Sequence, residues 1–115
     1  MDEAQLIALV VKALSLHQTT GCLYYIDGDL ENRVRQELAS VGTIAAIKAL
    51  LVNYATNSGI VEIRRETRAE YQSRREFWFR VLVPIVGSPK PLFFELELTD
   101  EDCDYPSVAI LNVHF

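Results

Sequence analysis

The sequence predicts an α+β fold, with about three N-terminal helices packed on an antiparallel meander sheet of about four strands. Apolar residues recur at helical spacing up to Gly59, and from Ile60 onward they alternate with polar residues. Helices followed by a run of strands are typical of this class. The 115 residues, 50% of them hydrophobic, fit a single domain over positions 1–115 that can bury its own core.

The first helix is expected at residues 2–17. Its apolar residues cover more than half of a helical circumference, so we expect burial against more than one neighbour or in a subunit interface. The acidic residues Asp2 and Glu3 suit the positive end of the helix dipole. A break follows, and the short run 22–26 has strand character.

Two more helices follow in the N-terminal half. Asp29 is the expected N-cap of the second, in which apolar residues recur from Leu30 to Val41 at helical spacing. Thr43 is the expected N-cap of the third, which should end near Asn57.

The remainder of the chain should form strands. They are expected at residues 60–66, 77–85, 92–98 and 107–114. Residues 86–90 have the composition of a hairpin turn. In the third of these strands Glu95, Glu97 and Thr99 occupy the polar phase, so that face of the sheet should meet water.

Charge and cysteine content narrow the function classes. A net charge of −5 disfavours a protein that coats nucleic acid through its bulk charge, because such binding depends on Lys and Arg. Cys22 and Cys103 form no CxxC pair or Cys/His cluster, which favours a reduced, cytoplasmic setting. The N-terminus is acidic, and no apolar run approaches the roughly 20 residues of a membrane span, so neither a signal peptide nor membrane insertion is expected.

Basic residues are concentrated between positions 64 and 80. This segment holds six arginines: Arg64, Arg65, Arg68, Arg74, Arg75 and Arg80. With three glutamates it carries +3, so the remainder of the chain carries −8. Tyr71, Phe77 and Trp78 are interleaved with the arginines, and planar guanidinium groups suit phosphates and carboxylates. One interpretation is a polar connection with internal Arg–Glu pairs; the other is an anion-binding or RNA-contacting ridge that includes Arg64, Arg68, Arg74 and Arg75.

The sequence offers one candidate for acid–base catalysis and no metal-site pattern. His114 could act as a general base if the fold brought it near Arg65, Tyr71 or Arg80, as a metal-independent ribonuclease requires. His17 and His114 lack zinc-ligand spacing.

The acidic turn at residues 100–106 has the Asp-x-Asp-x-Asp spacing of a calcium loop. However, Tyr105 and Leu111 stand where that loop needs Gly and Glu. The favoured interpretation is a solvated loop, which could contact the arginines of a second subunit. We therefore expect no metal and no cofactor.

The layout of residues 44–114 resembles the small RelE/BrnT/MqsR-type toxin superfamily and its uncharacterised relatives. The segments that carry the resemblance are 57–62, 77–81, 91–95 and 110–114. The resemblance implies RNA cleavage on a sheet face, with Arg65, Tyr71, Arg80 and His114 in the matching roles and an antitoxin as partner.

Two functional hypotheses follow. The first is a non-enzymatic cytoplasmic interaction protein that forms a homodimer, because apolar side chains are abundant and catalytic candidates are few. The second is a toxin-like, metal-independent ribonuclease that uses the arginines and His114.

Overall fold

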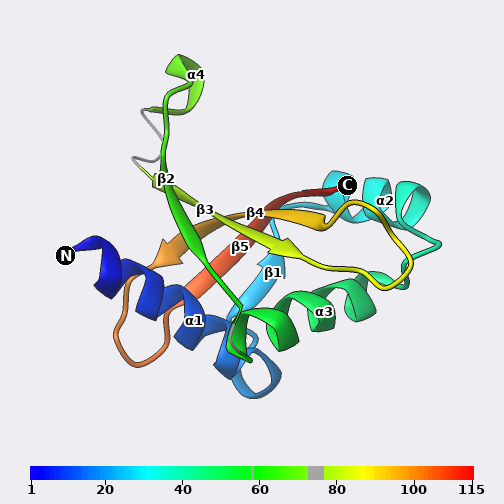
Figure 1. The fold of residues 1–115 in the computed structure, drawn as a ribbon. Coiled ribbons are helices and arrows are strands. Elements are labelled where there is room, and N and C mark those ends of the chain that lie inside the picture. The colour runs from blue at the N-terminus through cyan, green and yellow to red at the C-terminus, as the bar shows by residue number, and fades with distance from the viewer. Residues whose placement is uncertain (58, 73–76) are drawn as a thin grey trace.

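A computed structural model describes residues 1–57, 59–72 and 77–115. The elements, in chain order, are α1 (Glu3–Thr20), β1 (Leu23–Tyr25), α2 (Gly28–Glu37), α3 (Ile44–Thr56), β2 (Glu62–Arg65), α4 (Ala69–Gln72), β3 (Phe77–Val83), β4 (Leu92–Asp100) and β5 (Ser107–His114). Figure 1 shows α1 and α3 on one side of the sheet, with α4 standing away from the rest of the chain. The α+β class with helices on a sheet is confirmed.

The five strands are arranged in the order β1-β5-β4-β3-β2. β1 is parallel to β5, whereas the other neighbouring pairs are antiparallel. The prediction of about four antiparallel strands is therefore wrong in strand number and in the direction of one pair. The run at residues 22–26 does form a strand, β1. This strand pairs in parallel with β5, which lies near the other end of the sequence. The backbone N–H of Val108 donates to the carbonyl of Cys22 over 2.8 Å.

The helix α1 begins where the sequence indicates. The Asp2 carboxylate accepts the backbone N–H of Gln5 at 2.8 Å, and the Gln5 side chain accepts the backbone N–H of Asp2 at 2.9 Å, which forms a capping box. The helix ends at Thr20, and its C-cap is Gly21, whose φ of 68° lies in the left-handed region. Among the described residues, no helix combines the length and the apolar character needed to cross a bilayer.

The start of α2 corrects the sequence prediction. Asp27, not Asp29, is the N-cap, because its carboxylate accepts the backbone N–H of Leu30 at 2.8 Å. The helix ends at Glu37, four residues before the predicted limit at Val41. For α3 the prediction is confirmed, since the Thr43 hydroxyl accepts the backbone N–H of Ala46 at 3.1 Å.

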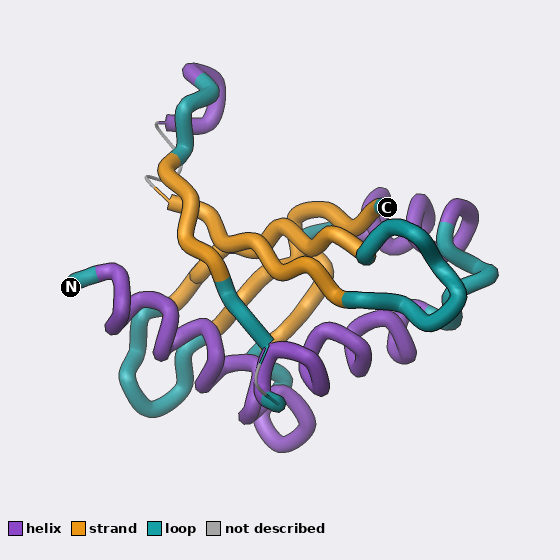
Figure 2. Tube along the Cα trace, viewed as in Figure 1, coloured by secondary structure: helices purple, strands orange, loops and turns teal. Residues whose placement is uncertain are grey.

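The core lies between the sheet and the helices α1 and α3. We call the sheet face beneath these helices the inner face; Figure 2 shows both helices along the same side of the strands. The largest fully buried side chains of the core include Leu14, Leu23, Ile47, Leu51, Phe79, Leu92, Phe94, Leu96 and Ile110. Alternation along β3 and β4 places Phe79, Val81, Phe94 and Leu96 in this core, which confirms the predicted two-residue period there.

Candidate functional site

The outer face of the sheet, opposite α1 and α3, collects several of the predicted site residues. Arg80 on β3 lies opposite Glu95 on β4, which in turn lies opposite Asn112 on β5. The neighbours of Arg80 along β3, Phe79 and Val81, are buried in the core. Because successive side chains of a strand point to opposite faces, Arg80, Glu95 and Asn112 share the outer face.

Arg64 and Arg80 lie on this face and share one carboxylate. Glu62 Oε2 accepts from Arg64 at 2.8 Å and from Arg80 at 2.5 Å. The hydrogen bond from Arg80 is the main reason that the pKa of Glu62 lies below its ordinary value, and the charges of both arginines act in the same direction. Two of the predicted cations are therefore neutralised in part by the chain's own carboxylate.

Arg68 bridges two buried carboxylates. Its guanidinium donates to both oxygens of Glu66, at 3.0 and 3.2 Å, and to Glu95 at 3.0 Å. The side chain of Glu66 is 1% exposed and that of Glu95 is 12% exposed. These hydrogen bonds, the one from Glu66 first, raise the pKa of Arg68 above its ordinary value. The prediction that Glu95 meets water is wrong, because Arg68 reaches across from the connection after β2 and covers it.

Arg65 lies on the opposite face from Arg64 and Arg80. It pairs in register with Phe77 on β3, and its guanidinium lies 5.4 Å from the centre of the Phe77 ring. This separation follows from alternation, since Arg64 and Arg65 are consecutive in one strand. The structure therefore does not bring Arg65 together with Arg80.

Three other predicted residues cannot be placed at the side-chain level. Tyr71 lies in α4, and its side chain falls outside the described part of the structure. Arg74 and Arg75 lie outside the described residues altogether. Their proposed roles in catalysis and anion binding stay predictions.

His114 lies on the outer face in register with Phe93, and the two rings stack with centres 4.8 Å apart. Trp78 extends the aromatic group, with its ring centre 6.3 Å from that of Phe93. The Nδ1 atom of His114 lies 2.9 Å from the carbonyl oxygen of Phe115. Because β4 separates β5 from β3, and strands are about 4.8 Å apart, His114 and Arg80 are about 10 Å apart across the sheet; they are also offset by two residues, about 6.6 Å, along it.

Sequence reasoning missed the carboxylates and the amide that hold this face together. Glu62 lies just before the arginine-rich segment, and Glu95 was assigned to the solvated face. Asn112 accepts a hydrogen bond from Arg33 of α2, and Arg33 also donates to the carbonyl of Val113 at 3.3 Å. The alternation of apolar and polar residues in β4 could have indicated one of these contacts. A register that pairs Phe79 with Leu96 in the core also places Glu95 opposite Arg80.

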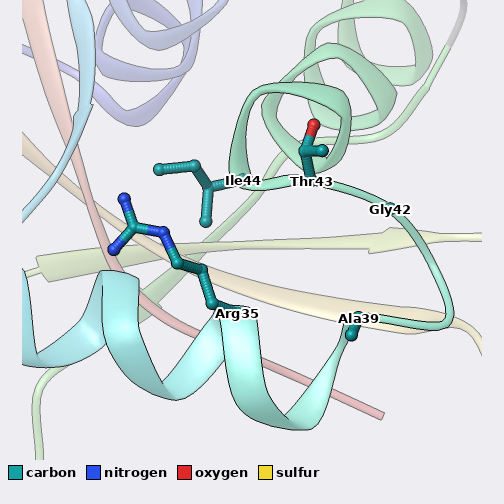
Figure 3. Close-up of a pocket in the computed structure, with 5 residues that line it drawn as sticks. All are labelled: Arg35, Ala39, Gly42, Thr43 and Ile44. Atoms are coloured by element: carbon teal, nitrogen blue, oxygen red, sulfur yellow. The ribbon is translucent and has the colours of Figure 1, made fainter.

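The junction of α2 and α3 forms a pocket of about 400 Å³, shown in Figure 3. Its residues are Arg35, Ala39, Gly42, Thr43 and Ile44. Arg35 donates to Asn32 at 3.0 Å and lies 3.6 Å from the Glu31 carboxylate. The cation in this pocket thus already has polar partners on its own helix.

The acidic turn folds around Asp102. Its carboxylate accepts the backbone N–H groups of Asp104 and Tyr105 at 2.8 and 3.0 Å, and these bonds lower the pKa of Asp102. Asp102, Cys103 and Asp104 are exposed neighbours. Lys12 of α1 donates to the carbonyl of Cys103 at 2.5 Å. One oxygen of Asp102 is therefore used to shape the turn.

A second group of titratable side chains comes from β1, from α3 and from the last turn of α1. The buried Tyr25 donates its hydroxyl to the carbonyl of Ile44 at 2.8 Å. Burial first, and the charge of Glu31 second, raise the pKa of Tyr25 to about 12. The ammonium of Lys48 lies 5.8 Å from the centre of the Tyr25 ring. Burial lowers the pKa of Lys48 and also that of His17, which additionally feels the charge of Lys48.

The outer face is therefore an amphipathic surface in which arginines are matched to carboxylates beside three aromatic rings. Such a surface can contact another protein, since protein interfaces are enriched in aromatic side chains and arginine. Stabilising the negative charge of a phosphoryl transition state would require its arginines to exchange a carboxylate for the substrate. Comparison of the chain with protein-family models, curated proteins and solved structures finds no match.

Proposed function

We propose that this chain is a non-enzymatic cytoplasmic interaction protein that forms a homodimer. The observation that carries the proposal is the internal matching of charge on the outer face. Glu62 engages Arg64 and Arg80, while Glu66 and Glu95 engage Arg68. Guanidinium groups held in this way attract phosphates less strongly than unpaired ones, whereas a surface of both signs suits contact with another protein.

The aromatic side chains beside these charges support the same proposal. Trp78 and Phe93 are half-buried, and the nearby His114 is exposed. Large aromatic rings contribute strongly to protein interfaces because they bury much apolar area with little loss of rotamer freedom. The isolated subunit thus keeps part of this area accessible to a partner.

The proposal is tested by light scattering and by assays of RNA cleavage with the purified chain. The mass should rise from that of one chain toward two as concentration increases from about 1 to 500 µM, a range that detects micromolar dissociation constants. A constant single-chain mass would refute the homodimer. Cleavage of RNA that is lost on Arg80→Ala and kept on Arg35→Ala would refute the non-enzymatic part.

A toxin-like ribonuclease is the second candidate, favoured by the shared face of the predicted residues. Arg64, Arg80 and His114 lie on the outer face, and Arg68 reaches it through Glu95. This candidate predicts growth arrest on expression, relief by co-expression of an antitoxin-like partner, and loss of RNA cleavage in Arg80→Ala or His114→Ala. Cleavage that survives both substitutions would remove these residues from the mechanism. Circular dichroism of each variant controls for loss of folding.

A further inference from the structure

The strand β2 forms one edge of the sheet. It pairs with β3 on one side, and in the described part of the chain no strand lies beyond it on the other. Arg64 and Arg65 are exposed, and Glu62 and Ile63 are partly exposed. The opposite edge is formed by β1, which has three residues and is followed almost at once by α2. Of the two edges, β2 therefore offers the longer backbone segment for strand addition.

We propose that the homodimer forms by antiparallel pairing of β2 with β2 of a second copy, which joins the two sheets into one. This inference rests on the proposed homodimer and assigns its interface. A dimer built from one repeated surface has a two-fold axis. For two antiparallel edge strands that axis stands perpendicular to the sheet, so each residue faces a partner residue on the same sheet face. The axis must then pass midway between one residue of β2 and the same residue of the second copy. An axis through a residue means an axis between that residue and its copy.

The charges of β2 select one register. An axis through Glu62, Arg64 or Arg65 would place two identical charges directly opposite each other, which is destabilising. An axis through Ile63 places an apolar side chain opposite its own copy. It also sets Glu62 opposite Arg64 of the partner subunit, and Arg64 opposite Glu62 of the partner subunit. This register creates two symmetric pairs of opposite charge on the outer face.

The geometry of the strand makes these pairs favourable. Within one chain Arg64 already donates to Glu62 at 2.8 Å, although residues two apart in a strand are about 6.6 Å apart along it. Directly opposite residues of an antiparallel pair have Cβ atoms only about 4.5–5.5 Å apart. Arg64 can therefore reach Glu62 of the partner subunit with less extension than its present bond requires.

Charged residues on an edge strand commonly prevent pairing, because like charges meet when copies approach. In β2 the outer-face charges alternate in sign from Glu62 to Arg64, so self-pairing in the Ile63 register is attractive. In this register three residues of each β2 pair with β2 of the second copy, so the contact is small. We therefore expect a dissociation constant of micromolar order, as for other small interfaces.

Cysteine cross-linking tests the position of the axis. In a Cys103→Ser background, which removes the exposed native thiol, Ile63→Cys should form an intermolecular disulfide on mild oxidation. The matched control is Arg65→Cys, on the same sheet face. In the proposed register its two copies are about 13 Å apart along the strands, too far for a disulfide. Cross-linking at Arg65→Cys in preference to Ile63→Cys would overturn the register.

Charge reversal tests the pairing of Glu62 with Arg64. Arg64→Glu should raise the dissociation constant about tenfold, because it replaces two attractive cross-strand pairs with two repulsive ones. Arg65→Glu makes the same change of charge on the inner face, where the proposed register has no charge pair, and should raise the dissociation constant less than about threefold. Mixing Arg64→Glu with Glu62→Arg should restore association, since both cross-strand pairs then join opposite charges.

The outcomes separate this inference from the proposed function. A wild-type chain that is monomeric by light scattering refutes both. A wild-type dimer with no Ile63→Cys cross-link and unchanged association of Arg64→Glu refutes the β2 interface and leaves the homodimer standing. Circular dichroism verifies the folding of each variant, and the cross-linking result decides the question if a charge variant does not fold.

Discussion

Replacing Arg68 with glutamine should destabilise the fold more than the same change at Arg64 or Arg80, the arginines that β2 and β3 place on the outer face. Arg68 is the shared donor to Glu66 and Glu95, two carboxylates whose side chains are 1% and 12% exposed. Arg68→Gln keeps a polar side chain of moderate length but removes the positive charge. The two carboxylates then remain largely buried and lose the hydrogen bonds and the positive charge of Arg68.

The magnitude follows from burial. Removing one partner of a fully buried ion pair costs about 3–5 kcal/mol. The side chain of Arg68 is itself 44% exposed, so water can partly replace it, and we take about half of that cost, ~2 kcal/mol. For a chain of this length the loss corresponds to a decrease in Tm of about 8 °C. By comparison, Arg64→Gln breaks a pair that is exposed on both sides and should cost less than ~1 kcal/mol.

Urea unfolding at pH 7 measures this effect. The loss of unfolding free energy in Arg68→Gln should exceed that in Arg64→Gln, because the carboxylates that Arg68 contacts are the more deeply buried ones. A loss no larger than that of Arg64→Gln would refute the role assigned to Arg68.

Three further predictions concern other parts of the fold. Tyr25 has its pKa raised from 10.0 to about 12, so its stabilising contribution is complete below pH 10 and is lost as the pH rises toward 12; a phenol that titrates near pH 12 in absorbance at 295 nm should be missing in Tyr25→Phe. Gly21→Ala should cost about 1 kcal/mol because its φ is 68°, whereas Gly28→Ala, in open space on α2, should stabilise by ~0.5 kcal/mol; thermal unfolding of both variants checks the difference in sign. Glu62→Gln should lose less than ~1 kcal/mol at pH 7, and because the folded pKa lies below 4.5 this difference should decrease as the pH falls below 4.5 and acid titrates the carboxylate; a deficit that does not decrease in urea unfolding between pH 7 and pH 3 would contradict the ion pairs of Glu62.

Local sequence signals predicted a helix start correctly where one side chain near that start is suited to accept a backbone N–H group. Thr43 caps α3 as predicted, because its hydroxyl accepts a backbone N–H of the first turn; Asp2, expected only as a favourable charge at the helix start, is the N-cap of α1. The same rule failed for α2, where Asp27 and Asp29 are both suitable caps. In the fold Asp27 is the cap, and Leu30 and Val34 are buried in the core.

The candidate site depended on contacts that no local pattern contains. The sequence showed that arginines are concentrated between positions 64 and 80, and the two-residue period places Arg64 and Arg65 on opposite faces. It did not show that Arg68 would reach Glu95, which lies 27 positions away. Glu95 was therefore expected to meet water and is instead buried.

The sequence by itself determined the fold class, the Thr43 cap of α3 and the last strand at Ser107–His114, because periodicity and capping act over a few neighbouring residues. Only the tertiary structure decided that β1 adds to β5 in parallel, and which carboxylate compensates each described outer-face arginine. Both depend on strand register between distant segments, which is set by the packing of the whole inner face. The sequence shows the excess of arginine between positions 64 and 80. Only the alignment of the strands shows that Arg64, Arg68 and Arg80 bind carboxylates of the same chain.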